Sequence, residues 1–92
     1  MEMLGLDELD LSGISPELLL GAIRTLEKIY FEWGVTLTAE QVNAILCMVT
    51  EARHGKLNKI VIWRSYVLGT INPELLQAAN LMGDLVEIHL NE

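Results

Sequence analysis

Two nearly identical helix starts constrain this chain more than any other feature. The hexapeptide Ile-Ser-Pro-Glu-Leu-Leu begins at position 14, and Ile-Asn-Pro-Glu-Leu-Leu begins at position 71. In each copy, Ser15 or Asn72 can cap a helix by accepting a hydrogen bond from an amide of the first turn. The proline that follows suits the first helical position, where its missing N–H group costs no hydrogen bond. The sequence therefore predicts helices that begin at Pro16 and Pro73.

A third helix start lies between these two. Thr38 and Gln41 have the spacing of a capping box, in which each side chain bonds to the backbone amide of the other residue. After the helix starts at Pro16 and Thr38, apolar residues recur every three or four positions. After the start at Pro73, apolar residues surround a narrow polar line. These patterns predict helices over residues 16–33, 38–54 and 73–90.

Residues 58–68 are ambiguous. Ile60 to Trp63 is a β-branched and apolar run that is typical of a buried strand. One isolated strand in a helical chain would have no partner, however, so we interpret 58–68 as a fourth helix. The predicted fold is therefore all-α, a small four-helix bundle of two helical hairpins.

The chain is short enough for one domain. We expect an acidic arm with several leucines over residues 1–13 and a single helical domain over 14–92. The two similar helix starts are 57 residues apart, from position 14 to position 71, and this offset matches none of the common solenoid periods. Shared helix-start chemistry, rather than an internal repeat, is our interpretation of their likeness.

Apolar residues are unusually frequent for so small a chain. They make up 51% of the sequence, and with the glycines counted in and the tyrosines left out the fraction exceeds the usual value of roughly 45–50%. The predicted helix 73–90 has only a narrow polar line, so most of its surface needs a cover. The sequence therefore predicts a homodimer, with an interface formed by Leu75, Leu81, Leu85 and Ile88.

The formal net charge of −7 argues against a general affinity for nucleic acid or for anionic membranes. Four of the six basic residues nevertheless fall between positions 53 and 64, next to two aromatic residues of the kind that interfaces favour. The sequence predicts that this cluster binds another protein through Arg53, Lys56, Lys59, Trp63, Arg64 and Tyr66.

No residue pattern indicates catalysis or a cofactor. Cys47, Glu51 and His54 share one face of a predicted helix and offer a possible set of metal ligands. A structural zinc site needs four ligands, so we interpret this set as a solvated polar stripe and predict no metal, no cofactor and no catalytic residue. A single cysteine excludes an internal disulfide.

These observations predict a non-enzymatic interaction module that inhibits, neutralises or escorts another protein. Chaperones, immunity proteins and phage or plasmid inhibitors are accessory factors of this type. A dimeric, helix-turn-helix-like regulator that uses the basic segment 53–64 is one alternative, and a small enzyme is another. The first residues do not resemble a signal peptide, and no apolar run reaches the ~20 residues that a membrane span needs, so we expect a cytoplasmic protein.

Overall fold

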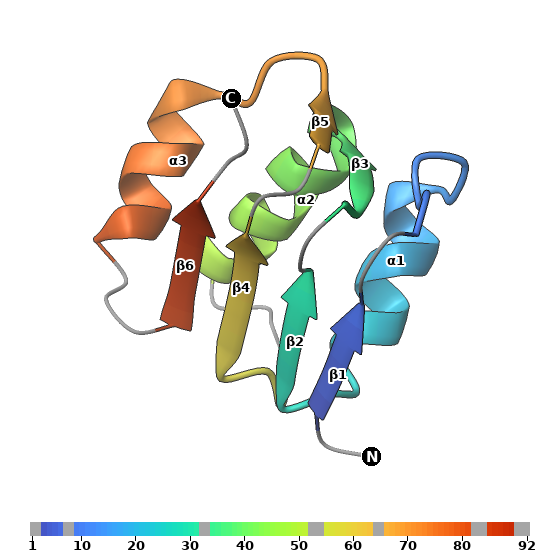
Figure 1. Cartoon of the computed structure of the whole chain (residues 1–92). Coiled ribbons are helices and arrows are strands. Elements are labelled where there is room, and N and C mark those ends of the chain that lie inside the picture. The colour runs from blue at the N-terminus through green and yellow to red at the C-terminus, as the bar shows by residue number, and fades with distance from the viewer. Residues whose placement is uncertain are drawn as a thin grey trace.

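The computed structural model describes residues 3–6, 9–31, 34–51, 55–63, 66–81 and 85–89, with backbone alone for 3–6 and 89. Helices and strands alternate along these residues (Figure 1). In chain order the elements are β1 (Met3–Leu6), α1 (Pro16–Ile23), β2 (Lys28–Phe31), β3 (Thr36–Thr38), α2 (Ala39–Thr50), β4 (Lys59–Trp63), β5 (Tyr66–Leu68), α3 (Pro73–Asn80) and β6 (Val86–His89).

A four-stranded parallel sheet is the centre of the fold. Its strand order is β1-β2-β4-β6, while β3 and β5 form a separate two-stranded parallel sheet. Each strand of the large sheet therefore lies beside the one before it, and every connection steps in the same direction. Right-handed connections of this kind place their helices on one face of the sheet. Figure 1 shows the helices behind the strands, and α2 packs against both α1 and α3.

The strands of the large sheet recur along the chain at unequal intervals, with a helix in each interval. Leu4, Ile29, Ile60 and Val86 are aligned across the sheet, and they lie 25, 31 and 26 residues apart in the chain. The helix caps Ser15, Thr38 and Asn72 are 23 and 34 residues apart. The 57-residue offset between the two similar helix starts is thus the length of two β–α units. The two similar helix starts therefore begin α1 and α3, which lie two β–α units apart in the chain.

The all-α bundle predicted from the sequence is wrong, because every predicted helix except 38–54 contains a strand. The helix predicted over 16–33 ends at Ile23, and its second half forms β2. The segment 58–68 forms β4 and β5, and 73–90 divides into α3 and β6. The strand-like run from Ile60 to Trp63 does have partners, since β2 and β6 flank it on either side.

The premature end of α1 explains how a strand was mistaken for helix. Thr25 Oγ1 donates a hydrogen bond to the Ala22 carbonyl (2.7 Å), and the amides of Thr25 and Leu26 bond three residues back. These short-range bonds tighten and close the last turn. No glycine or proline marks this boundary in the sequence. The apolar residues of β2 continue the helical spacing of those in α1 by coincidence, so the pattern predicted a longer helix.

The capping residues predicted from the sequence are confirmed. Ser15 Oγ accepts from the Leu18 amide, Asn72 Oδ1 accepts from the Glu74 amide, and Thr38 forms the complete capping box with Gln41. Gln41 is 1% exposed, and its Nε2 also donates to the carbonyls of Leu11 and Ile14, both at 2.7 Å. This one side chain therefore joins the start of α2 to the loop that precedes α1.

The segment predicted as an acidic arm is joined to both sheets. Residues 3–6 form the edge strand β1 beside β2. The Thr36 amide donates to the Leu9 carbonyl (2.8 Å), and the Leu11 amide donates to the Thr36 carbonyl (2.9 Å). Backbone pairing, rather than packing of leucine side chains alone, thus places this segment.

The hydrophobic core fills the space between the sheet and the helices. Strands β2 and β4 contribute Ile29, Phe31, Ile60 and Ile62, each at most 1% exposed. Helix α2 lies against them with a buried apolar stripe at helical spacing, which consists of Val42, Ile45, Leu46 and Val49. The central strands β2 and β4 therefore direct one face of the larger sheet into the core.

Candidate functional site

The other face of the large sheet is not covered by any helix or strand that the structure describes (Figure 1). Successive side chains of a strand point to opposite faces, so each buried core position alternates with a position on the uncovered side. We call this uncovered side the open face. Its described side chains are Lys28 and Tyr30 from β2, Lys59, Val61 and Trp63 from β4, and Glu87 from β6.

Burial along the strands supports this division. In β2, Lys28 is exposed and Tyr30 is half-buried, whereas the intervening Ile29 and the following Phe31 are inaccessible. In β4, Trp63 is 51% exposed, while its neighbour Ile62 is fully buried. Val61 is an exception on the open face, since it is only 6% exposed. An exposed tryptophan at the end of a central strand is the least expected of these features, because Trp is highly buried on average.

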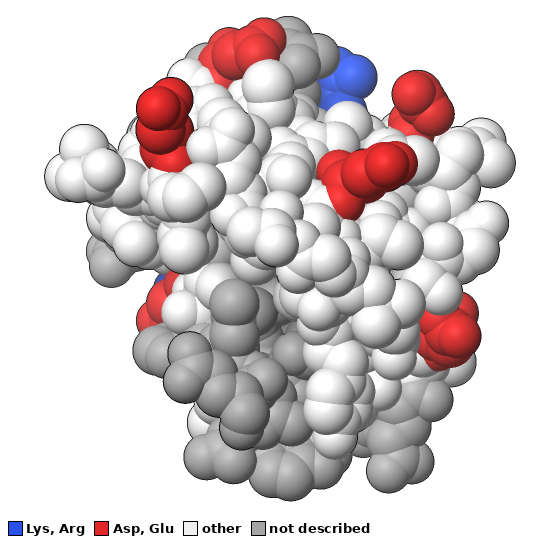
Figure 2. All heavy atoms as spheres, turned by 90° about the horizontal axis from the view of Figure 1, so that it is seen from above, with Lys and Arg blue, Asp and Glu red and all other residues white. Residues whose placement is uncertain are grey.

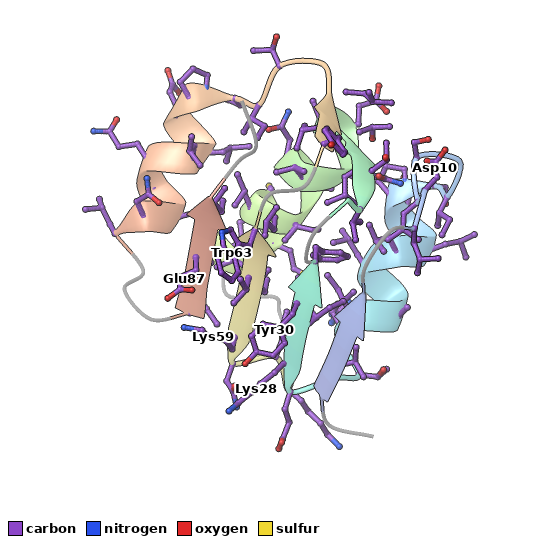
Figure 3. The ribbon with its side chains drawn as sticks, viewed as in Figure 1. Asp10, Lys28, Tyr30, Lys59, Trp63 and Glu87 are labelled. Carbon is purple, nitrogen blue, oxygen red and sulfur yellow. The ribbon has the colours of Figure 1, made fainter. Side chains whose placement is uncertain are left out.

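Strand register arranges the open face in rows. Lys28 lies directly opposite Lys59 at the amino end of the sheet. The next row contains Tyr30, Val61 and Glu87, which are aligned across three strands. Trp63 follows toward the carboxyl end. Figure 3 labels Lys28, Tyr30, Lys59, Trp63 and Glu87 on the same side of the sheet, with the lysines nearest the lower edge.

One ion pair crosses the open face. Lys59 Nζ lies 3.6 Å from a carboxylate oxygen of Glu87, and the two side chains are 25% and 50% exposed. Water screens so exposed a pair, so its contribution to stability is only about 0–1 kcal/mol. Among the residues that the structure describes, no carboxylate pairs with Lys28.

The described basic residues gather at the amino ends of the strands. We call this group, Arg24, Lys28, Lys56 and Lys59, the basic edge. The two loops that carry it are bonded to each other, because the Lys56 amide donates to the Arg24 carbonyl (3.4 Å) and the Lys59 amide to the Glu27 carbonyl (3.2 Å). Residues far apart in sequence are thereby brought to one end of the molecule.

Gly55 permits this close approach of the two loops. Its φ angle is +61°, a region that favours glycine, and a Cβ atom there would lie 2.8 Å from the Arg24 carbonyl oxygen. A side chain at this position would push the loops of the basic edge apart. The opposite end of the molecule carries scattered carboxylates and little positive charge (Figure 2).

The predicted partner-binding residues separate in the structure. Lys59 and Trp63 lie on the open face, and Lys56 lies on the basic edge. Tyr66 is 51% exposed on β5, in the smaller sheet. Arg53 and Arg64 lie outside the described residues.

The sequence interpretation missed Lys28, Tyr30 and Glu87, which complete the open face. The available signal was the alternation of polar and apolar residues in Lys-Ile-Tyr-Phe and Val-Glu-Ile-His. Each of these tetrapeptides was included in a predicted helix. Their alternation is too short to outweigh a longer helical period.

The four residues of the predicted dimer interface do not share one helix. Leu75 belongs to α3, Ile88 belongs to β6, and both pack partly buried against the core, as does Leu85. Leu81, directly after α3, is 84% exposed. The continuous helix over 73–90 that motivated this interface is therefore absent, and of the four residues Leu81 presents the most surface.

The candidate metal ligands are only partly described. Cys47 Sγ donates to the Glu51 carboxylate at 2.7 Å, and His54 lies outside the described residues. Within the described ranges, no three His, Cys, Asp or Glu side chains are grouped so that they could hold a metal ion.

Elsewhere, hydrogen bonds from Ser12 lower the pKa of the Asp10 carboxyl and close the loop before α1.

The basic segment 53–64 does not provide the helix that a helix-turn-helix motif requires, since Lys59–Trp63 form a strand. Among the described residues, no helix is both long and apolar enough to cross a membrane. The chain matches no protein-family model, no curated protein and no solved structure at a significant level.

Proposed function

We propose that this chain is a non-enzymatic protein-binding module, built as a short β–α solenoid, and that it binds its partner on the open face. The observation that carries the proposal is a central strand, β4, that ends in the half-exposed Trp63 on a sheet face without a described cover. Half-buried Tyr30 lies on the neighbouring strand of the same face. Trp and Tyr supply a large share of binding energy at protein interfaces.

The spacing of core residues supports the solenoid architecture. Leu26, Ile29 and Phe31 follow the pattern L-x-x-L-x-L, as do Leu57, Ile60 and Ile62 in the next unit. This spacing, with one strand and one helix per unit, is typical of leucine-rich repeats. Stacked units of this kind present long surfaces that bind other proteins.

The proposed consequence of binding is inhibition, neutralisation or escort of the partner, within a reducing cytoplasm. Self-association is a further proposal, and it rests on the high apolar content and on the exposed Leu81. Light scattering tests it directly, because a monomer has a mass of 10.3 kDa. A dimer that Leu81→Glu dissociates would place the interface at the end of α3.

The binding proposal is tested by comparing two double variants. Tyr30→Ser with Trp63→Ser removes the aromatic side chains of the open face. Leu18→Ser with Leu81→Ser removes two apolar side chains elsewhere, which are 71% and 84% exposed. Both variants should keep the circular dichroism spectrum of the wild type.

Immobilised wild type and both variants are then used to capture proteins from native extract, with mass spectrometry as the readout. We expect a set of proteins that the wild type and the Leu18/Leu81 variant retain and that the Tyr30/Trp63 variant loses. Capture that survives loss of the open-face aromatics would contradict the proposal. Equal loss in both variants would indicate nonspecific apolar binding and would contradict it as well.

A further inference from the structure

The lysine row of the open face is unfavourable for the fold by itself. Lys28 and Lys59 are directly opposite each other on adjacent strands, and like charges in that arrangement destabilise a strand pair. Glu87 lies 3.6 Å from Lys59, but no described carboxylate pairs with the exposed Lys28. Two ammonium groups and one carboxylate leave a net positive charge at this end of the face.

The rest of the described surface carries mostly the opposite charge. Each helix has a glutamate in its first turn, namely Glu17, Glu40 and Glu74, and these helices begin at the end toward which the strands point. Figure 2 shows separate carboxylates across that end. Glu27 and Glu51 lie at the same end as the basic edge and offset part of the charge of its four basic residues. An acidic ligand would therefore be repelled by the end where the helices begin and attracted to the net positive charge of the basic edge. Such a distribution steers association toward one site.

The open face changes from charged to apolar along the strands. The lysine row comes first, the row of Tyr30, Val61 and Glu87 follows, and Trp63 is last. From Lys59 to Trp63 the strand rises roughly 13 Å, at about 3.3 Å per residue. A peptide of similar length in an extended conformation would span both the lysines and the tryptophan.

We propose that the open face binds an acidic segment of a protein partner, with a carboxylate between Lys28 and Lys59 and an apolar side chain on Trp63. This inference rests on the proposed function and adds the chemistry and the orientation of the ligand. A nucleic acid fits less well, because its backbone carries one charge per ~1.7 Å of duplex. Such a density would meet Glu87 and a chain with a net charge of −7.

The test is a selection of peptides from a phage-displayed random library on the immobilised wild-type protein. Selected peptides are then synthesised, and their affinities for four variants are measured by fluorescence anisotropy. Lys28→Glu reverses one charge of the lysine row, and Lys28→Arg keeps it. Lys56→Glu is the matched control, because Lys56 is exposed on the basic edge but belongs to the loop before β4. Trp63→Ser reports whether binding occurs on the open face.

We expect the selected peptides to combine Asp or Glu with an aromatic residue or leucine. Their affinity should fall at least about tenfold in Lys28→Glu and less than about threefold in Lys56→Glu, and Lys28→Arg should bind as the wild type does. Added salt should weaken binding to the wild type, because it screens the exposed lysines.

Three outcomes would overturn the inference. Peptides without acidic enrichment that still require Trp63 would refute the acidic ligand and leave the proposed function intact. Affinity that is unchanged in both Trp63→Ser and Lys28→Glu, or a selection without binders, would count against the open face itself. Displacement of the peptides by a single-stranded oligonucleotide at lower concentration than by free peptide would assign the face to nucleic acid.

Discussion

The two faces of the large sheet are built from the same strands but have opposite properties. On the covered face, Ile29, Phe31 and Ile62 are at most 1% exposed and pack against the helices. On the open face, the neighbouring Lys28, Tyr30 and Trp63 are exposed or half-buried. Adjacent residues of one strand thus have different surroundings. The binding proposed for the open face therefore predicts that stability and partner binding separate between substitutions one residue apart.

The strongest test of this comparison is a pair of alanine substitutions in β2. Phe31→Ala removes a fully buried aromatic side chain and should lower the free energy of unfolding by about 3–5 kcal/mol. Tyr30→Ala, one residue earlier, should cost less than half as much, because its ring is only partly removed from water. Urea denaturation of both variants measures the two losses. Equal losses would show that the open face is covered.

Gln41 extends the comparison to the helix layer. Gln41→Met keeps the volume of the side chain but removes the donor that Gln41 Nε2 provides to the carbonyls of Leu11 and Ile14, and it removes the acceptor of the Thr38 amide. We expect a loss of roughly 2–4 kcal/mol in the free energy of unfolding. The control Glu40→Ala changes the exposed neighbour and should stay within about 0.5 kcal/mol. A neutral Gln41→Met would contradict the link between α2 and the loop that precedes α1.

Two glycine substitutions sharpen the account of the basic edge. Gly55→Ala should destabilise the protein by about 1–3 kcal/mol, because the residue has positive φ and the added Cβ atom would lie 2.8 Å from the Arg24 carbonyl oxygen. Gly21→Ala lies inside α1 with open space around it, so it should stabilise by about 0.5–1 kcal/mol. Thermal denaturation of the two variants measures the sign of each change in stability. A stabilising Gly55→Ala would mean that the loops do not approach as described.

The smallest effect is expected from the ion pair of the open face. A double-mutant cycle with Lys59→Gln and Glu87→Gln should give a coupling of about 0–1 kcal/mol, since both side chains are substantially exposed. The coupling should decrease further in high salt. A value of several kcal/mol would show that this pair is shielded from water and that the open face belongs to the core.

Much of the local structure could be predicted from the sequence, because caps act over a few residues. Ser15, Thr38 and Asn72 mark the helix starts correctly. The helix ends were missed, since α1 ends at Arg24 through backbone hydrogen bonds and no glycine or proline marks that position in the sequence. Gly34, directly after the predicted helix 16–33, does have positive φ, but it follows β2 rather than a helix.

Local sequence patterns could not predict the pairing of strands in the sheet. Each parallel strand pairs with a segment about 25–31 residues away, and its register depends on contacts that no single window contains. The candidate site was missed for the same reason. Lys59 and Trp63 were identified from composition, whereas Lys28, Tyr30 and Glu87 join them only when β2, β4 and β6 lie side by side.

The measurement that tests the central claim most directly is an NMR analysis of cross-strand contacts in the isotope-labelled protein. The structure predicts nuclear Overhauser effects that connect Ile29 with Ile60 and Ile60 with Val86, together with slow amide exchange in β4. Continuous contacts between successive amides over residues 58–68 and 73–90 would instead indicate helices there. That result would contradict the parallel sheet, and with it the open face and the binding mode proposed for it.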